Sequence, residues 1–75
     1  MKVYVAKIMI EGTNYSTCKV KLSADLGDLK KYVQGLVDAY VDTGADVMEK
    51  TDLKCVVMND GIGTKSTITI ETHEI

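Results

Sequence analysis

The stretch "SADLGDLKKYVQGLVDAYVDTGA", residues 23–45, decides the fold because its apolar residues recur three and four positions apart. That spacing lays a single apolar stripe along one side of a helix. The stripe consists of Leu26, Leu29, Val33, Leu36, Val37, Tyr40 and Val41. Asp25 or Ser23 can cap the start of the helix, and Gly44 stands where a left-handed C-cap is expected. The stretch therefore predicts one amphipathic helix, which needs another layer to pack against.

Two segments before this helix and two after it have the patterns of strands. Lys2–Ile10 is rich in β-branched residues and apolar on both alternations, which is typical of a central strand. Tyr15–Leu22 alternates between apolar and polar residues, and "EGTN" at 11–14 supplies a turn that joins these two segments as a hairpin. Leu53–Met58 and Lys65–His73 complete the set. The acidic stretch between the helix and Leu53, "ADVMEKTD" at 45–52, is interpreted as a connection.

The order strand, strand, helix, strand, strand predicts a single α+β domain over residues 1–75. We expect a four-stranded antiparallel sheet (β-β-α-β-β) with the one helix packed on one face. A chain below roughly 80 residues has a thin core, so such domains often depend on disulfides, metals or oligomerisation. The helix leaves the second face of the sheet without a cover.

This open face is the first candidate binding surface. Side chains alternate between the two faces along each strand, and by this alternation we assign the following partner or dimer contacts to the open face: Val3, Val5, Met9, Tyr15, Lys19, Lys21, Val56 and Met58. So many Val and Met side chains form a larger apolar patch than a small monomer usually exposes. We therefore expect a cover, either a protein partner or a second copy of the chain. A homodimer would form by packing sheet against sheet or by pairing an exposed edge strand.

Acidic residues make the second candidate surface. The net charge is only −2, but residues 25–52 carry seven acids and three lysines. Asp38 and Asp42 lie one helical turn apart, and Asp46 and Glu49 continue the acidic run. Carboxylates spaced in this way can attract a basic protein partner. The alternative is a solvated helix face that keeps the protein soluble.

The basic residues argue against a nucleic-acid partner. All nine are lysine, and without arginine the chain lacks the planar fork that reads guanine or grips phosphate in bidentate fashion. The two cysteines, Cys18 and Cys55, occupy apolar positions in the middle of strands, which predicts buried, reduced thiols. No secretion signal and no apolar run of about 20 residues is present. We expect a soluble cytoplasmic protein with no membrane contact.

One stretch, "NDGIGTKS" at 59–66, resembles a phosphate-binding loop at first sight. A Walker-type loop needs glycine directly before the Lys-Ser pair and another five residues earlier, and here those positions hold Thr64 and Asn59. A dinucleotide-binding loop would need a third glycine at Ser66 and a helix after it. The stretch instead predicts the hairpin turn between the last two strands, where Asn59, Asp60 and Gly61 permit the positive backbone angles of a tight turn and Gly63 gives a second flexible point or bulge.

The remaining chemistry-bearing residues do not form a catalytic or metal-binding pattern. His73 lies near the C-terminus, and Glu71 and Glu74 beside it could hold a metal only weakly. Neither cysteine has a histidine nearby in the sequence that could activate it. We therefore expect no enzymatic activity, no cofactor and no metal.

These observations favour a small non-enzymatic protein-binding domain that acts by stoichiometric binding to a larger basic protein. In size and surface character the chain is comparable to phage and mobile-element inhibitors of host defence, such as anti-CRISPR and anti-restriction proteins, which is an analogy of class only. The alternative is a homo-oligomeric module that binds a small anionic ligand, such as a nucleotide, at a subunit interface. Its cationic contacts would be Lys19, Lys21 and Lys65.

Overall fold

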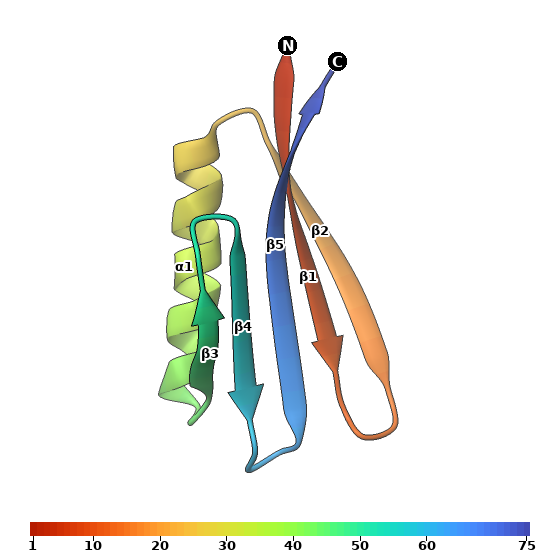
Figure 1. Cartoon of the computed structure of the whole chain (residues 1–75), viewed down its shortest axis with the longest axis vertical. Coiled ribbons are helices and arrows are strands. Elements are labelled where there is room, and N and C mark those ends of the chain that lie inside the picture. Colours follow the sequence, from red (N-terminus) through yellow and green to blue (C-terminus); the bar gives the residue numbers. More distant parts are fainter.

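The structure is a computed structural model that describes residues 1–75. Its elements are one helix, α1 (Leu26–Asp42), and the strands β1 (Lys2–Glu11), β2 (Ser16–Ser23), β3 (Asp46–Lys50), β4 (Lys54–Asn59) and β5 (Thr64–Glu74). The strands form one antiparallel sheet in the order β2-β1-β5-β4-β3, and α1 lies along one side of it (Figure 1). The predicted α+β class with one helix is confirmed, but the sheet has five strands, not four.

The additional strand, β3, lies where the sequence predicted an acidic connection over 45–52. It pairs with β4, and its register shifts between Val47 and Glu49, which marks a β-bulge at Met48. A bulge breaks the two-residue alternation by which strands are detected, and all five residues of β3 are exposed, so no apolar signal marks a buried side. The predicted connection was wrong for these two reasons.

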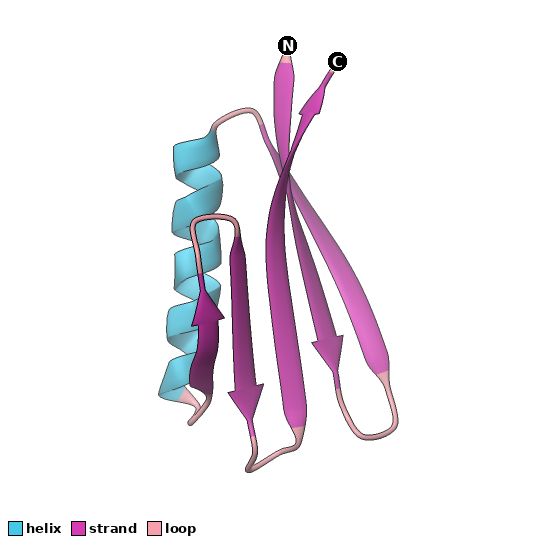
Figure 2. Ribbon diagram, in the orientation of Figure 1, coloured by secondary structure: helices cyan, strands magenta, loops and turns pink.

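The helix has the boundaries that its capping residues predict. The Asp25 carboxylate accepts a hydrogen bond from the backbone N–H of Asp28 at 3.0 Å, and the Ser23 hydroxyl donates to the Asp25 carbonyl at 2.9 Å. At the other end Gly44 has a φ of +101°, the left-handed conformation that favours glycine there. Figure 2 shows α1 as a single uninterrupted helix beside the sheet. It lacks the length and apolar character that a bilayer crossing requires.

The core lies between α1 and the three inner strands. Val37 packs with Ile8, Cys55 and Ile68 in one cluster, and Leu29 packs with Ala6 and Ile70 in a second. The even-numbered residues of β1 therefore point towards the helix. Residues directly opposite each other on neighbouring strands share a face of the sheet. The register therefore shows, for each remaining strand residue, whether it lies on the helix side or on the open side.

This register reverses the predicted orientation of β2. Lys19 lies opposite Ile8 and Lys21 opposite Ala6, so both lysines are on the helix side of the sheet. Cys18, Val20 and Leu22 are on the open side. The usual rule of apolar residues towards the core fails here, because β2 is an edge strand and seven of its eight residues are exposed. The prediction that placed Lys19 and Lys21 on the open face is wrong.

The stretch 59–66 is the turn between β4 and β5, as predicted. Asn59 organises it with its side chain, whose Oδ1 accepts hydrogen bonds from the backbone N–H of Gly61 at 3.0 Å and of Ile62 at 3.3 Å. Its Nδ2 donates to the Thr43 carbonyl at 3.3 Å, which ties the turn to the end of α1. The positive φ occurs at Gly63, at +69°, and not at Asn59, Asp60 or Gly61.

Candidate functional site

The open face of the sheet carries side chains from all five strands. We define it by the register as Val3, Val5, Lys7, Met9 and Glu11 of β1, Cys18, Val20 and Leu22 of β2, Asp46 and Glu49 of β3, Lys54, Val56 and Met58 of β4, and Lys65, Thr67, Thr69, Glu71 and His73 of β5. Five of the eight contacts predicted for this face lie on it: Val3, Val5, Met9, Val56 and Met58. The structure also adds Cys18, which was predicted to be buried, together with Val20 and Leu22.

The apolar residues of the open face are covered to very different extents. Val5 and Val56 are each only 8% exposed, because neighbouring side chains surround them. Met9 is 46% exposed, Val20 58% and Leu22 61%. The exposed apolar side chains therefore lie mostly on the half of the face formed by β1 and the edge strand β2.

The middle of the open face is hollow. A groove of about 540 Å³ is lined by residues from every strand, from Cys18 on one edge to Met48 on the other. Its apolar lining consists of Met9, Cys18, Met48 and Val56, and the other seven lining residues are polar or charged, with Lys65 and Glu11 among them. A groove that crosses a whole sheet in this way is large enough for a side chain or a short segment of another protein.

Charges on the open face are largely neutralised in pairs. Lys7 Nζ lies 3.1 Å from one oxygen of Glu71, and His73 Nε2 lies 3.1 Å from the other. The hydrogen bond from Lys7, with a second from His73, lowers the pKa of the Glu71 carboxyl. Lys54 Nζ lies 3.6 Å from Glu49 on the neighbouring strand. Lys7, Glu49 and Lys54 also line the groove, so paired charges and apolar side chains are mixed within it.

The four predicted acidic contacts do not form one surface. Asp38 and Asp42 are on α1, where Asp38 accepts a hydrogen bond from Gln34 Nε2 at 2.8 Å. Asp46 and Glu49 are on β3 and point to the open side, away from the helix. Asp42 is the last helical residue, and the last turn of α1 has no basic residue. The C-terminal end of a helix already carries partial negative charge. The carboxylates of Asp38 and Asp42 add to it and concentrate negative charge at this end.

The three lysines of the predicted anion site are separated by the sheet. Lys19 and Lys21 are on the helix side, and the ammonium of Lys21 lies 5.3 Å from the centre of the Tyr32 ring. Lys65 lines the groove on the open side. Tyr15 also lies on the helix side, where it lines a hollow together with Tyr40. The structure therefore does not bring Lys19, Lys21 and Lys65 to one ligand-sized site.

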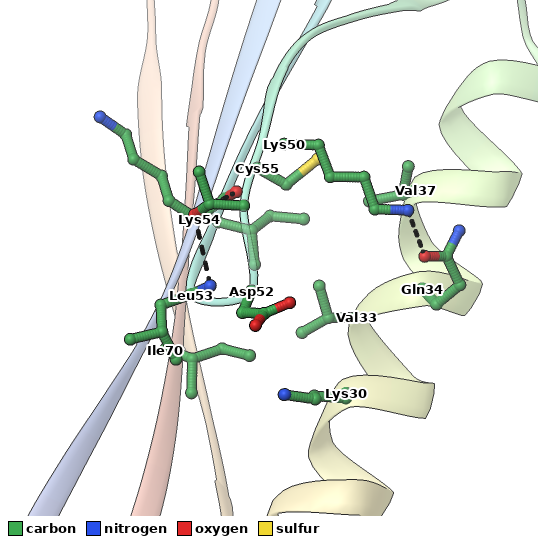
Figure 3. A pocket seen from close by; sticks show the side chains of 12 residues that line it. Lys30, Val33, Gln34, Val37, Lys50, Asp52, Leu53, Lys54, Cys55 and Ile70 are labelled. Atoms are coloured by element: carbon green, nitrogen blue, oxygen red, sulfur yellow. Dashed lines mark hydrogen bonds between the residues drawn. The ribbon is translucent and has the colours of Figure 1, made fainter.

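A second cavity, which the sequence did not indicate, lies between α1 and the β3–β4 hairpin (Figure 3). Its volume is about 180 Å³, and its apolar walls include Val33, Val37 and Ile70. Figure 3 shows the charged groups of Lys30 and Asp52 beside this space, and Lys50 Nζ donates to Gln34 Oε1 at 2.7 Å. The volume is below the roughly 300 Å³ at which ligand pockets usually begin, so we assign it to incomplete packing under the hairpin.

The two cysteines have opposite environments. Cys55 is 4% exposed, as predicted, and burial raises the pKa of its thiol, an effect that the charge of Lys50 partly offsets. Cys18 is exposed on the open side of β2, which contradicts the prediction that both thiols are buried. The cause is the reversed orientation of β2 described above.

Comparison with known protein families, with curated proteins and with solved structures finds no match to this chain.

Proposed function

We propose that this protein is a non-enzymatic protein-binding domain that meets its partner through the open face of its sheet. The observation that carries the proposal is the groove of about 540 Å³ that crosses all five strands on the face without a helix. Its lining mixes four apolar residues with polar and charged ones, and non-obligate protein interfaces are likewise about as polar as the rest of a protein surface. The partner is either another protein or a second copy of the chain, which would form the predicted homodimer.

The chemistry of His73 and Cys55 supports a non-enzymatic role. His73 is held by Glu71 at an exposed strand end, and the thiol of Cys55 is buried with a raised pKa. A thiol with a raised pKa is a poor nucleophile at neutral pH.

A basic partner would have a second point of contact at the C-terminal end of α1. There the helix dipole and the exposed carboxylates of Asp38 and Asp42 add up to a negative potential. This supports the interpretation as a stoichiometric inhibitor of a larger basic protein. Such contacts mainly increase the rate of association and depend on salt.

The test compares two substitutions of matched exposure on different surfaces. Met9 on the open face is 46% exposed, and Leu53, between β3 and β4 and outside the groove, is 53% exposed. We expect Met9→Lys to abolish capture of the partner from lysate of the source organism, and Leu53→Lys to retain it. Reversing Asp38 and Asp42 to lysine weakens capture in a salt-dependent way if the partner is basic.

Light scattering of the purified chain distinguishes the two kinds of partner. A mass of twice 8.2 kDa that Met9→Lys converts to 8.2 kDa identifies the second copy as the occupant of the open face. A monomer that captures a different protein identifies a heterologous partner. Equal capture by wild type and Met9→Lys, with no dimer in solution, contradicts the proposal.

A further inference from the structure

The two edges of the sheet differ in how well they are protected. β3, at one edge, has only five residues and contains a bulge, two features that prevent pairing with a further strand. β2, at the other edge, pairs with β1 over all eight of its residues without a register shift. It contains neither proline nor glycine. The outer side of β2 is therefore a regular and accessible strand edge.

The hydrogen-bond pattern identifies which backbone groups of β2 are free. The N–H of Gly12 donates to the Tyr15 carbonyl, so even-numbered residues of β1 direct their backbone groups towards β2. Such groups alternate in direction along an antiparallel strand. The register then leaves the N–H and C=O groups of Ser16, Cys18, Val20 and Leu22 directed outwards, away from β1.

The side chains along this edge differ in chemistry between the two sides of the sheet. Lys19 and Lys21 project on the helix side, and neither has a carboxylate within ion-pair distance. Val20 and Leu22 project on the open side and are mostly exposed. An added strand would gain from acids opposite the lysines and from apolar residues opposite Val20 and Leu22.

We propose that β2 accepts an extended segment of a partner protein in which acidic and apolar residues alternate, so that the segment becomes a sixth strand of the sheet. The free backbone groups supply affinity, and the lysines supply register and selectivity. The proposal rests on the proposed function in one respect, that the partner is a protein.

A second copy of the chain is a poor occupant of the same edge. Antiparallel two-fold pairing of β2 with itself over its full length centres on Lys19 or on Val20. The first places Lys19 opposite its own copy, and the second places Lys19 opposite Lys21 of the other copy. Like charges directly opposite each other destabilise a strand pair. The charge of the edge therefore selects an acidic strand rather than another β2.

The experiment uses two blocked peptides of about nine residues, long enough to span the eight residues of β2. Valine alternates with glutamate in one and with lysine in the other. We expect the acidic peptide to bind the full chain in calorimetry and to slow amide hydrogen exchange at Cys18, Val20 and Leu22. N-methylation of alternate amides in the peptide should abolish binding, because it removes the backbone donors.

Charge reversal supplies the matched control. Lys19→Glu with Lys21→Glu should weaken the acidic peptide by about tenfold or more and favour the basic one. Lys30→Glu with Lys31→Glu changes the net charge equally but lies on exposed positions of α1, and should leave the preference unchanged. Equal binding of both peptides, unchanged binding after reversal at β2, protection at another strand, or no binding at millimolar peptide overturns the proposal.

The outcome is independent of the open-face test. Met9→Lys should retain the acidic peptide, since Met9 lies on β1 and contributes no group to the outer edge. Peptide binding without any effect of Met9→Lys on partner capture would support the β2 edge and reject the open face. Capture that depends on Met9 without peptide binding would do the reverse.

Discussion

The ammonium of Lys21 lies 5.3 Å from the centre of the Tyr32 ring, which places the lysines of β2 on the same side of the sheet as α1. Pairing with β1 in this register turns Cys18, Val20 and Leu22 to the open side. The orientation of β2 therefore determines which side of this edge is apolar and which is cationic. The proposed strand-binding site on β2 follows from it.

The contact between Lys21 and Tyr32 should contribute measurably to stability. Tyr32→Leu removes the aromatic face and should lower the free energy of unfolding by about 0.5–1 kcal/mol, whereas Tyr32→Phe keeps the ring and should change it little. Urea denaturation measures both. If the Leu and Phe variants are equally stable, the ring does not interact with the lysine.

The thiols should react at very different rates. In native buffer a thiol reagent such as DTNB should modify Cys18 rapidly and leave Cys55 unmodified, because Cys55 is buried and its pKa is raised. One thiol per chain is expected in the native protein and two in urea. Cys18→Ser should reduce the native count to zero. Rapid reaction of a thiol in that variant would show that β4 is not buried as described.

Gly35 and Gly44 provide a matched pair for testing the backbone of α1. An added Cβ would have no neighbour within 4 Å at either position, but only Gly44 has a positive φ. Gly35→Ala should therefore raise the free energy of unfolding by about 1 kcal/mol, because alanine is the better helix former. Gly44→Ala should lower it by about 1 kcal/mol or more, because alanine is strained in that conformation. Effects of the same sign at both positions would contradict the capping geometry.

The ion pair between Lys7 and Glu71 should make stability depend on pH. The pKa of Glu71 is lowered in the folded state, so its contribution is present above the unfolded value and is lost as the pH falls through the folded one. The stability difference between wild type and Glu71→Gln should therefore shrink below about pH 4. Denaturation at a series of pH values measures it. Glu11→Gln is the control, since Glu11 forms no ion pair. A difference that does not change with pH would rule out a lowered pKa.

The fold could be predicted where a residue pattern acts locally. The apolar stripe and the caps at Asp25 and Gly44 define α1, since helix periodicity and capping involve only neighbouring residues. The turn at 59–66 was recognised for the same reason, although Gly63, rather than the Asn-Asp-Gly run, takes the positive φ. The candidate site was predicted in part, because Val3, Val5, Met9, Val56 and Met58 belong to inner strands whose assigned faces agree with the register.

The sequence by itself determined the helix, the β1–β2 and β4–β5 hairpins and the existence of a sheet face without a cover. Only the tertiary structure decided that β3 is a strand, that β2 turns its lysines towards the helix side and that Asp38 and Asp46 lie on different surfaces. The physical reason is common to all three. An alternating pattern indicates that a strand has two faces, but pairing with a neighbouring strand decides which face is which. At the edges of a thin sheet, burial is too weak to overrule that pairing.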